Sequence, residues 1–251
     1  MCRHLAYLGA ETSIHRLVVA PRHGLYEQSW APRRQQHGTV NADGFGVGWY
    51  AEGDPVPARY RRAVPIWADP SFADVARVTR TTALLAAVRS ATPGTGQGED
   101  AAAPYTDGIH LFSHNGRLDA WPEGLGALAA TLPPADLLAL EARCDSAVLW
   151  ALLRRRLADG ETADRAAAAV VAQAAAHSQG RYNILVTDGR TITATAYGDT
   201  LFYGKLPGGV VIASEPDADG AWTEVPDRTL VTATREAVHL HPIPHAMADR
   251  S

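Results

Sequence analysis

The order of strand-like and helix-like segments limits most strongly what this chain can fold into. Strand-like runs, rich in β-branched and other apolar residues, occupy 82–88, 108–114, 182–187, 191–197, 210–214 and 229–234. Helix-like segments occupy 71–80, 135–143, 146–159 and 162–177. Because strands and helices do not alternate strictly, the order disfavours a doubly wound parallel sheet. It favours an α+β fold in which antiparallel sheets and helices form separate layers.

Composition and charge set the broad class of the chain. Its 251 residues are 46% hydrophobic, which is ordinary for a globular protein with a sizeable core. There is no repeat of fixed period and no clear domain boundary, so we predict one domain over 1–251. The formal net charge of −4 gives no electrostatic argument for binding nucleic acid or a membrane. The glycine- and proline-rich segment 93–108 is predicted to be a long surface loop, and whether it acts as a lid stays open.

The apolar runs and cysteines bear on where the protein works. The run "LAYLGA" near the N-terminus has six residues, too few for a signal peptide, and no run approaches the roughly 18 residues of a membrane helix. Two cysteines, Cys2 and Cys144, do not make a disulfide framework. We therefore expect a cytoplasmic protein.

Cys2 directly follows the initiator methionine. If Met1 is removed, Cys2 carries a thiol and a free α-amino group with a pKa of about 7.7–8.0, so nucleophile and base stand in one residue. Taken alone, a small second residue is more often without chemical purpose. The chemical hypothesis therefore depends on what the rest of the chain supplies.

The segment "SHNGRL" at 113–118 supplies a candidate oxyanion hole. The amide of Asn115 with the backbone N–H of Gly116 would suit a developing oxyanion. Asn-Gly between apolar strands is also the strongest short hairpin signal, so we predict a tight turn here. The two interpretations are compatible.

Two charged residues are candidates for binding substrate. Arg89 ends an apolar strand just before the 93–108 loop and is suited to hold a carboxylate bidentately, although a surface arginine is the commoner explanation. Asp145, at the start of a helix, is either an ordinary N-cap or an anion for a substrate ammonium. Cys144 beside it is predicted to be a packing residue.

Two further motifs give weaker signals. The glycines of "DGFGVGW" at 43–49 do not form a dinucleotide fingerprint, but they allow a close approach to a ligand or another strand. His239 and His241 have possible metal-ligand spacing on one strand face. Without a third ligand at recognisable spacing, we expect structural or solvated histidines and predict no metal.

Taken together and in order, these motifs resemble the class II (N-terminal cysteine) glutamine amidotransferases of the Ntn-hydrolase superfamily. The matching pieces span nearly the whole chain: "MC" at 1–2, "NADGFGVGW" at 41–49, "VRSAT" at 88–92, "SHNG" at 113–116, "CDS" at 144–146, "NILVTDGRTITATAYGDTLFY" at 183–203 and "VVIASEP" at 210–216. The resemblance implies a four-layer αββα sandwich of two packed, mainly antiparallel sheets, as one such domain over 1–251.

The resemblance also implies roles for individual residues. Cys2 would be the nucleophile, with its α-amine as base, and Asn115 and Gly116 would form the oxyanion hole. Arg89, with Thr92, would hold the α-carboxylate of a γ-glutamyl group, and Asp145 its α-ammonium. The chain departs from the commoner pattern at Ala147, where a Glu often follows. No cofactor is implied.

The pieces "MCRHLAYLG", "RSATPG" and "AAAPY" are similar to one branch of the family, the γ-glutamyl-hercynylcysteine S-oxide hydrolases of ergothioneine biosynthesis. That branch implies release of glutamate from the conjugate through a Cys2 thioester. The leaving half would carry a quaternary ammonium, which favours aromatic faces; Trp49 and Trp30 are candidates. Because the chain ends soon after the expected amidase fold, a stand-alone hydrolase with a small-molecule substrate and no obligatory protein partner is the simpler expectation.

Three alternatives stay open. The chain could be a glutaminase subunit that feeds ammonia to a separate synthetase. It could be a degenerate amidase fold that binds a γ-glutamyl ligand or a protein, although Cys2, Asn115 and Asp145 are all retained. Lipidation of Cys2 as a membrane anchor lacks a supporting basic or apolar segment.

Overall fold

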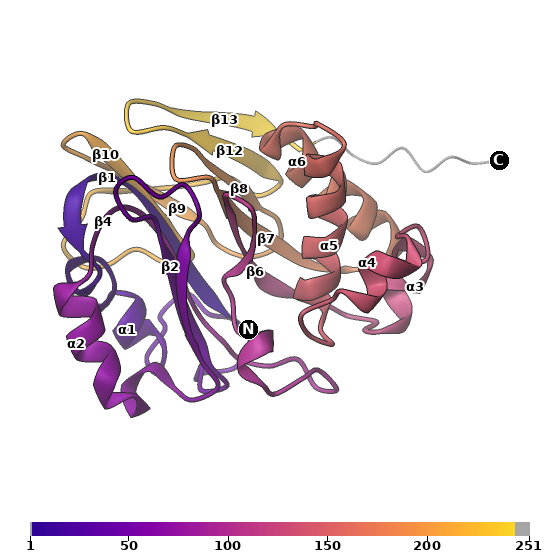
Figure 1. Cartoon of the computed structure of the whole chain (residues 1–251), viewed down its shortest axis with the longest axis horizontal. Helices are drawn as coiled ribbons and strands as arrows, with labels where there is room; N and C mark the ends of the chain where they lie inside the picture. The colour runs from indigo at the N-terminus through magenta and orange to yellow at the C-terminus, as the bar shows by residue number, and fades with distance from the viewer. Residues whose placement is uncertain (1, 244–251) are drawn as a thin grey trace.

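Two antiparallel sheets form the centre of the protein in the computed structural model, which describes residues 2–243 (Figure 1). Met1 and residues 244–251 lie outside the described residues, so the predicted removal of Met1 is not addressed. The seven-stranded sheet contains β1 (Arg3–Ser13), β2 (Phe45–Trp49), β3 (Ala58–Arg62), β4 (Arg80–Val88), β9 (Phe202–Leu206), β10 (Gly209–Ala213) and β11 (Trp222–Glu224). The six-stranded sheet contains β5 (Tyr105–Asp107), β6 (His110–Leu118), β7 (Gly180–Thr187), β8 (Ile192–Ala196), β12 (Thr229–Ala233) and β13 (Val238–Pro242).

The N-terminal strand β1 lies in the middle of its sheet. The strand order there is β11-β9-β10-β1-β4-β2-β3, and in the other sheet it is β13-β12-β8-β7-β6-β5. In the first sheet Arg3 pairs with Val88, and Val88 also pairs with Phe45 on its other side. The residues just outside this row, Cys2 and Arg89, are therefore brought to the same end of the sheet.

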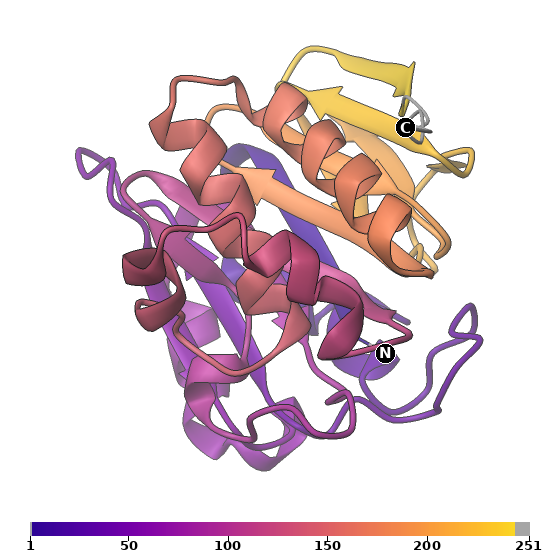
Figure 2. The ribbon, with the colours of Figure 1, turned by 90° about the vertical axis from the view of Figure 1, so that its right-hand side faces the viewer.

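Helices cover the outer face of each sheet. They are α1 (Leu25–Gln28), α2 (Pro70–Val78), α3 (Gly126–Ala129), α4 (Pro134–Leu138), α5 (Asp145–Ala158) and α6 (Ala163–His177), with short helical turns η1 (His15–Val19), η2 (Ile66–Ala68), η3 (Glu99–Ala101) and η4 (Glu123–Leu125). The first two helices and η1 lie against the seven-stranded sheet, and α3 to α6 lie on the side of the six-stranded sheet (Figures 1 and 2). This arrangement confirms the predicted four-layer αββα sandwich.

The alternation of side chains along β1 separates two of the three apolar cores. Leu5 and Tyr7 pack on the α1–α2 side, whereas Ala6 and Leu8 pack between the sheets. The third core lies between the six-stranded sheet and α5 and α6. Continued one step toward the N-terminus, the alternation directs His4 to the space between the sheets.

The predicted helices are confirmed except at 135–143. Helix α4 ends at Leu138, whose side chain is 89% exposed, while Leu137 and Leu140 pack partly against the helical core. The apolar residues there do not form one continuous face, so the helix stops after five residues and the chain bends before α5 begins. Among residues 2–243, no helix is both long enough and apolar enough to cross a membrane.

The predicted long loop at 93–108 is partly wrong. Its second half forms η3 and the edge strand β5, which pairs with β6, and Ala101, Ala102 and Tyr105 are buried. The tyrosine ring packs near Phe112 of β6, so this half belongs to the sheet. Only the first half stays an exposed loop, apart from the buried Thr95.

Candidate active site

Cys2 stands at the start of the central strand β1, at one end of the space between the sheets. Its side chain is half-buried, and its Sγ donates to the backbone oxygen of Ser90 at 3.8 Å. Because Ser90 follows β4, which pairs with β1, the contact is set by the sheet itself. The nucleophile predicted from sequence therefore occupies a defined and partly accessible position.

Asn115 and Gly116 lie inside β6, not at a turn. Both pair across to β7, Asn115 with Asn183 and Gly116 with Tyr182. The predicted Asn-Gly hairpin is therefore wrong, because the long β6–β7 ladder overrides the local turn preference. A side chain at Gly116 would collide with the Arg181 backbone oxygen, so glycine is needed there for space.

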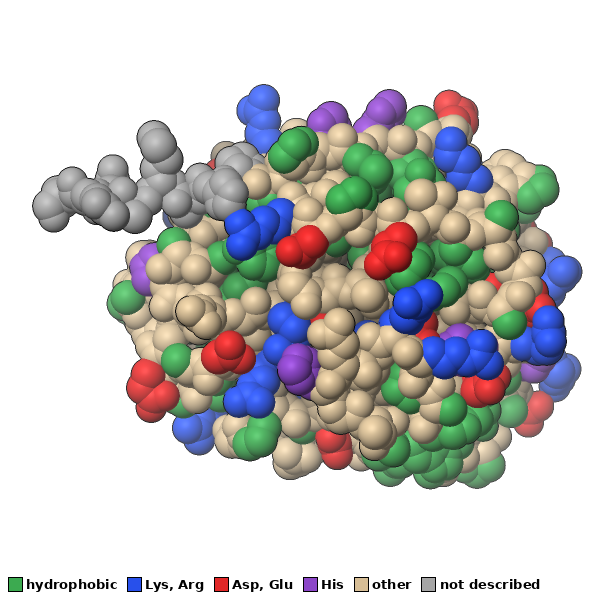
Figure 3. Space-filling model, turned by 180° about the vertical axis from the view of Figure 1, so that it is seen from behind, with side chains coloured by type: hydrophobic (Ala, Val, Ile, Leu, Met, Phe, Trp, Pro, Cys, Tyr) green, Lys and Arg blue, Asp and Glu red, His purple; other side chains and the backbone are tan. Residues whose placement is uncertain are grey.

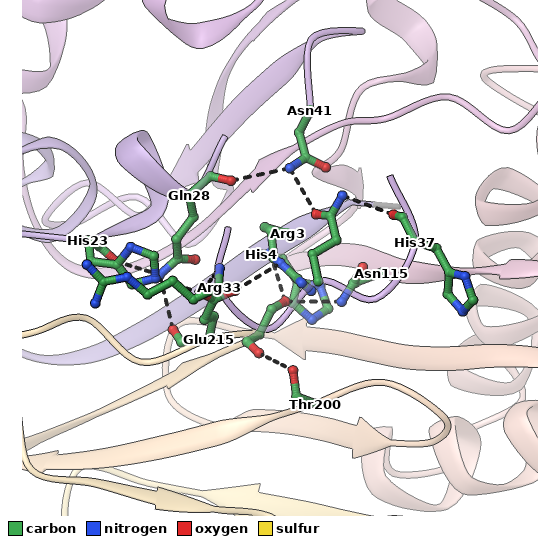
Figure 4. A network of polar contacts seen from close by, with 12 residues as sticks. Arg3, His4, His23, Gln28, Arg33, His37, Asn41, Asn115, Thr200 and Glu215 are labelled. Carbon is green, nitrogen blue, oxygen red and sulfur yellow. Dashed lines mark hydrogen bonds and ion pairs between the residues drawn. The ribbon is translucent and has the colours of Figure 1, made fainter. Parts of the chain in front are cut away.

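The side chain of Asn115 is fully buried and bonded across the two sheets. Its Nδ2 donates to Ser214 Oγ at 3.2 Å, and the same Oγ accepts the backbone N–H of His4 at 3.1 Å. The His4 ring in turn makes a 3.0 Å hydrogen bond to Ser113 Oγ of β6. The segment that begins with Cys2 is thus tied to the strand that carries Asn115 (Figure 4).

Burial keeps the His4 ring neutral. Its pKa is lowered well below the usual 6.5, first by desolvation and then by the charges of His114 and Arg3. A protonated His4 would bring a second cation beside Arg3 in a buried place. We therefore assign His4 a supporting role in the neutral form.

Arg89 is buried at the end of β4, and its guanidinium is held by neutral groups. It donates to the backbone oxygens of Asp43 at 3.3 Å and Gly96 at 2.7 Å and to Thr95 Oγ1 at 3.1 Å. Within residues 2–243, no carboxylate forms an ion pair with it. The expectation of a surface arginine is wrong, and the charge is positioned by the loop that follows β4.

Asp145 is the first residue of α5 and is likewise buried. One carboxylate oxygen accepts the backbone N–H of Leu118 at 3.3 Å, and the other accepts that of Ser146 at 2.9 Å. No cation pairs with it in the part of the chain that the structure describes. The N-cap position belongs to Cys144, so Asp145 is not an ordinary N-cap.

Cys144 is buried in the helical core, as predicted for a packing residue. Its Sγ lies 3.2 Å from the Tyr105 hydroxyl, and burial raises the pKa of the thiol to about 11. Ala147, the departure from the family pattern, is buried in the same core. The departure at Ala147 does not disturb the start of α5, which begins at Asp145.

The loop after β4 supplies a hydrogen-bond partner of Arg89 that was not predicted from the sequence. Thr95, rather than Thr92, contacts the Arg89 guanidinium, and its hydroxyl donates to the Thr92 backbone oxygen at 2.6 Å. Gly96 also donates to the Arg143 backbone oxygen at 3.0 Å, next to the Cys144–Asp145 segment. The loop therefore links the surroundings of Arg89 to those of Asp145, and the role predicted for Thr92 stays a prediction.

A second group that the sequence did not single out surrounds Glu215. This buried carboxylate pairs with His23 Nε2 at 2.6 Å and Arg3 Nε at 3.5 Å, and it accepts the backbone N–H of Arg33 at 2.5 Å (Figure 4). Together with Ser214 it belongs to the quoted "VVIASEP" segment, which was the available signal. The group fixes the start of β1 against the loop that follows α1.

The two tryptophans predicted to face a quaternary ammonium lie in different places. Trp49 is the last residue of β2, four positions from the residue that pairs with Val88, and it packs on the α1–α2 side. Its role toward the quaternary ammonium stays a prediction. Trp30 is 41% exposed and meets Tyr26 and Trp67 edge to face. Hydrophobic side chains gather at the lower right of Figure 3, on the side of the molecule that carries α2.

His239 and His241 lie on the edge strand β13 with exposed side chains, as expected for solvated histidines. Among residues 2–243, no three His, Cys, Asp or Glu side chains come together as a metal-binding group.

Comparison with known proteins gives a consistent result. Residues 25–207 match the family model described as glutamine amidotransferases class-II. Over 253 residues and the full length of both chains, the protein is 43% identical to a gamma-glutamyl-hercynylcysteine sulfoxide hydrolase from Mycobacterium tuberculosis.

Solved structures support the fold. A glutamine aminotransferase class-II domain protein from Silicibacter pomeroyi matches with a TM-score of 0.68 at 21% identity, over 97% of this chain and all of that one. The glutamine phosphoribosylpyrophosphate amidotransferase of B. subtilis matches with a TM-score of 0.67 at 14% identity, over 98% of this chain and 50% of that one. At these identities the likeness concerns the fold alone.

Proposed function

The chain belongs to the class II glutamine amidotransferases, and from this premise we propose that it hydrolyses the γ-glutamyl amide bond of γ-glutamyl-hercynylcysteine sulfoxide. The products are glutamate and hercynylcysteine sulfoxide, a step of ergothioneine biosynthesis. The identity of 43% supports this substrate, because the match covers both chains in full.

The observation in the structure that carries the proposal is a pair of buried, opposite charges. Arg89 and Asp145 each bind only neutral groups among residues 2–243. An unpaired buried charge is costly, so such sites are suited to a ligand that brings the opposite charge. The α-carboxylate and α-ammonium of a γ-glutamyl group match the two.

The chemistry proceeds in two steps. The Cys2 thiolate attacks the γ-carbonyl carbon, and the oxyanion accepts hydrogen bonds from the Asn115 amide and the Gly116 N–H. The Cys2 α-amine takes the thiol proton and passes it to the leaving amine, so the C–N bond breaks and a γ-glutamyl thioester remains. Water then attacks the thioester, glutamate departs, and the thiol is restored.

The expected cellular location and partners follow from the chemistry of Cys2. A catalytic thiol must stay reduced, which favours the cytoplasm. The substrate is a small molecule, and the proposed steps need no partner protein, nucleic acid, membrane or cofactor.

The deciding experiment measures glutamate release by the purified protein from γ-glutamyl-hercynylcysteine sulfoxide and, in parallel, from glutamine. We expect release from the conjugate, none from a Cys2→Ala variant, and an intact mass that lacks Met1. Release from glutamine alone would replace the proposal with a glutaminase subunit. Release from neither, by protein with a free N-terminal Cys2, would favour the binding-module alternative.

A further inference from the structure

Ser214 joins the two halves of the site through one buried hydroxyl. It directly follows β10 and is fully buried. Its Oγ accepts the backbone N–H of His4 at 3.1 Å and meets the Asn115 amide at 3.2 Å. Its own backbone N–H donates to the His4 oxygen at 3.0 Å, and its oxygen accepts the Thr200 hydroxyl at 2.8 Å, so the residue itself is held on both sides.

The strands that this hydroxyl joins belong to different sheets. β1, which continues from Cys2, is in the seven-stranded sheet, and β6, which carries Asn115, is in the six-stranded one. Ladder hydrogen bonds fix positions within a sheet but not between two sheets. Apolar contacts between the sheets are not directional. The two directional hydrogen bonds of Ser214 Oγ, one to the His4 backbone and one to the Asn115 amide, therefore set where the oxyanion donor lies relative to the nucleophile.

The hydrogen-bond inventory of Asn115 adds a second observation. Its Oδ1 is buried and has no hydrogen-bond partner within residues 2–243, while Ser214 Oγ acts twice as an acceptor. A serine hydroxyl also has one proton to give. If the Asn115 amide is turned by 180°, the hydroxyl donates to Oδ1, still accepts from His4, and leaves the amide NH₂ free on the other side.

We propose that Ser214 is the positioning residue of the oxyanion hole: its hydroxyl holds the Asn115 amide with the NH₂ turned toward the substrate carbonyl. This inference rests on the proposed amide hydrolysis at Cys2. Ser214 touches neither the substrate nor the reacting atoms, and it acts entirely through Asn115. Its loss would therefore affect the transition state more than the binding of the γ-glutamyl group.

The test compares two variants of the same shape, Ser214→Thr and Ser214→Val, which differ only in the hydroxyl. Because misplacement of a catalytic group by about 1 Å costs up to about 10²-fold, we expect kcat of the Val variant to be roughly 10- to 100-fold below that of the Thr variant. The KM for the γ-glutamyl substrate should change little. Equal kcat values for the two variants would overturn the inference.

A double-variant comparison separates positioning from general damage. Ser214→Val should lower kcat in the otherwise unchanged protein and add little in an Asn115→Ala background. Full additivity would mean that Ser214 does not act through Asn115, and the inference would fail. The matched control is Thr195→Val, which removes a buried hydroxyl bonded to Tyr182 and Ile184 and should leave kcat unchanged.

Failure of this inference is distinguishable from failure of the proposed function. If the unaltered protein releases no glutamate from the conjugate, the function itself is wrong. If it does and the Thr and Val variants turn over equally, only the role of Ser214 is lost.

Discussion

The space between the two sheets has two parts, built by the same strands but from opposite kinds of residue. In the interior, Ala6 of β1 and Leu111 of β6 belong to one apolar core. Toward the Cys2 end the same strands instead present His4, Ser113 and Asn115, which are as deeply buried. Within a few residues, packing changes from apolar contact to hydrogen bonding.

The difference shows that the apolar part of this space stabilises the fold, whereas the polar part forms the candidate active site. Apolar burial holds the sheets together without demanding exact directions. Buried polar groups are costly unless they are paired, so they demand a particular arrangement. At the polar end His4 Nε2 and one atom of the Asn115 amide have no partner among the described residues. The polar end is therefore less stabilising than the apolar part but has a defined arrangement. Each prediction below tests this contrast between stability and activity.

The largest expected effect is on the apolar part and concerns stability. Leu85→Ala removes a fully buried side chain from the core between the sheets. We expect the free energy of unfolding to fall by about 2–5 kcal/mol because of lost burial and the cavity left behind. Urea unfolding measures this loss, and kcat of the folded variant should be unchanged. A large fall in kcat with intact stability would break the comparison.

The next effect is on the polar part and concerns turnover. Asn115→Ala removes the proposed oxyanion donor, so we expect kcat to fall by about 10²–10³-fold. Its stability should change far less than that of Leu85→Ala, because one amide atom is already without a partner. Steady-state kinetics and unfolding on the same samples give both values. Turnover equal to that of the unaltered protein would remove Asn115 from the mechanism.

A smaller effect is expected at the substrate-binding charge. Arg89→Ala should raise KM for the conjugate by about 10- to 100-fold, because hydrogen bonds to charged groups contribute about 1.5–3 kcal/mol. The value of kcat should change less. Arg77→Ala serves as the control, since Arg77 is an exposed arginine on α2 that pairs with Asp74. An unchanged KM would separate Arg89 from the γ-glutamyl site.

The sequence predicts those parts of the fold in which local pattern and packing agree. Helices α5 and α6 and the strands β4 and β7 begin and end within a few residues of their predicted bounds. The central strand β1 is not among the predicted strands. Its residues from Arg3 to Leu8 are buried on both faces of the sheet, so the sequence there does not alternate between buried and exposed positions. The Asn-Gly pair misled for the opposite reason, since a strong local turn pattern lies within a strand.

The residues of the candidate site likewise fall into those that the sequence predicts and those that it does not. Cys2, Asn115, Arg89 and Asp145 carry motifs that are recognisable one at a time. Ser214 has no such motif: its partners His4 and Asn115 lie 210 and 99 positions away along the chain. Such supporting residues follow from tertiary packing, so a single sequence does not disclose them.

The smallest predicted effect is the pH dependence that His4 adds to the polar end. Burial and the charges of His114 and Arg3 lower the folded-state pKa of His4 well below 6.5, whereas the unfolded chain binds a proton there near pH 6.5. The unfolded state therefore binds more protons as pH falls. His4 contributes its full stability above about pH 6.5 and loses up to about 1.4 kcal/mol per pH unit below it.

A His4→Gln variant should consequently lose stability less steeply than the unaltered protein as pH is lowered from about 6.5 toward 5. Leu85→Ala is the matched contrast: it removes no ionisable group, so its curve of unfolding free energy against pH should run parallel to that of the unaltered protein at a lower level. Urea unfolding across this range supplies all three curves. Equal slopes for the unaltered protein and His4→Gln would mean that His4 accepts a proton in the folded state. The polar end would then tolerate a buried cation at His4. Its buried polar groups would not need the particular hydrogen-bonded arrangement that distinguishes the polar part from the apolar part.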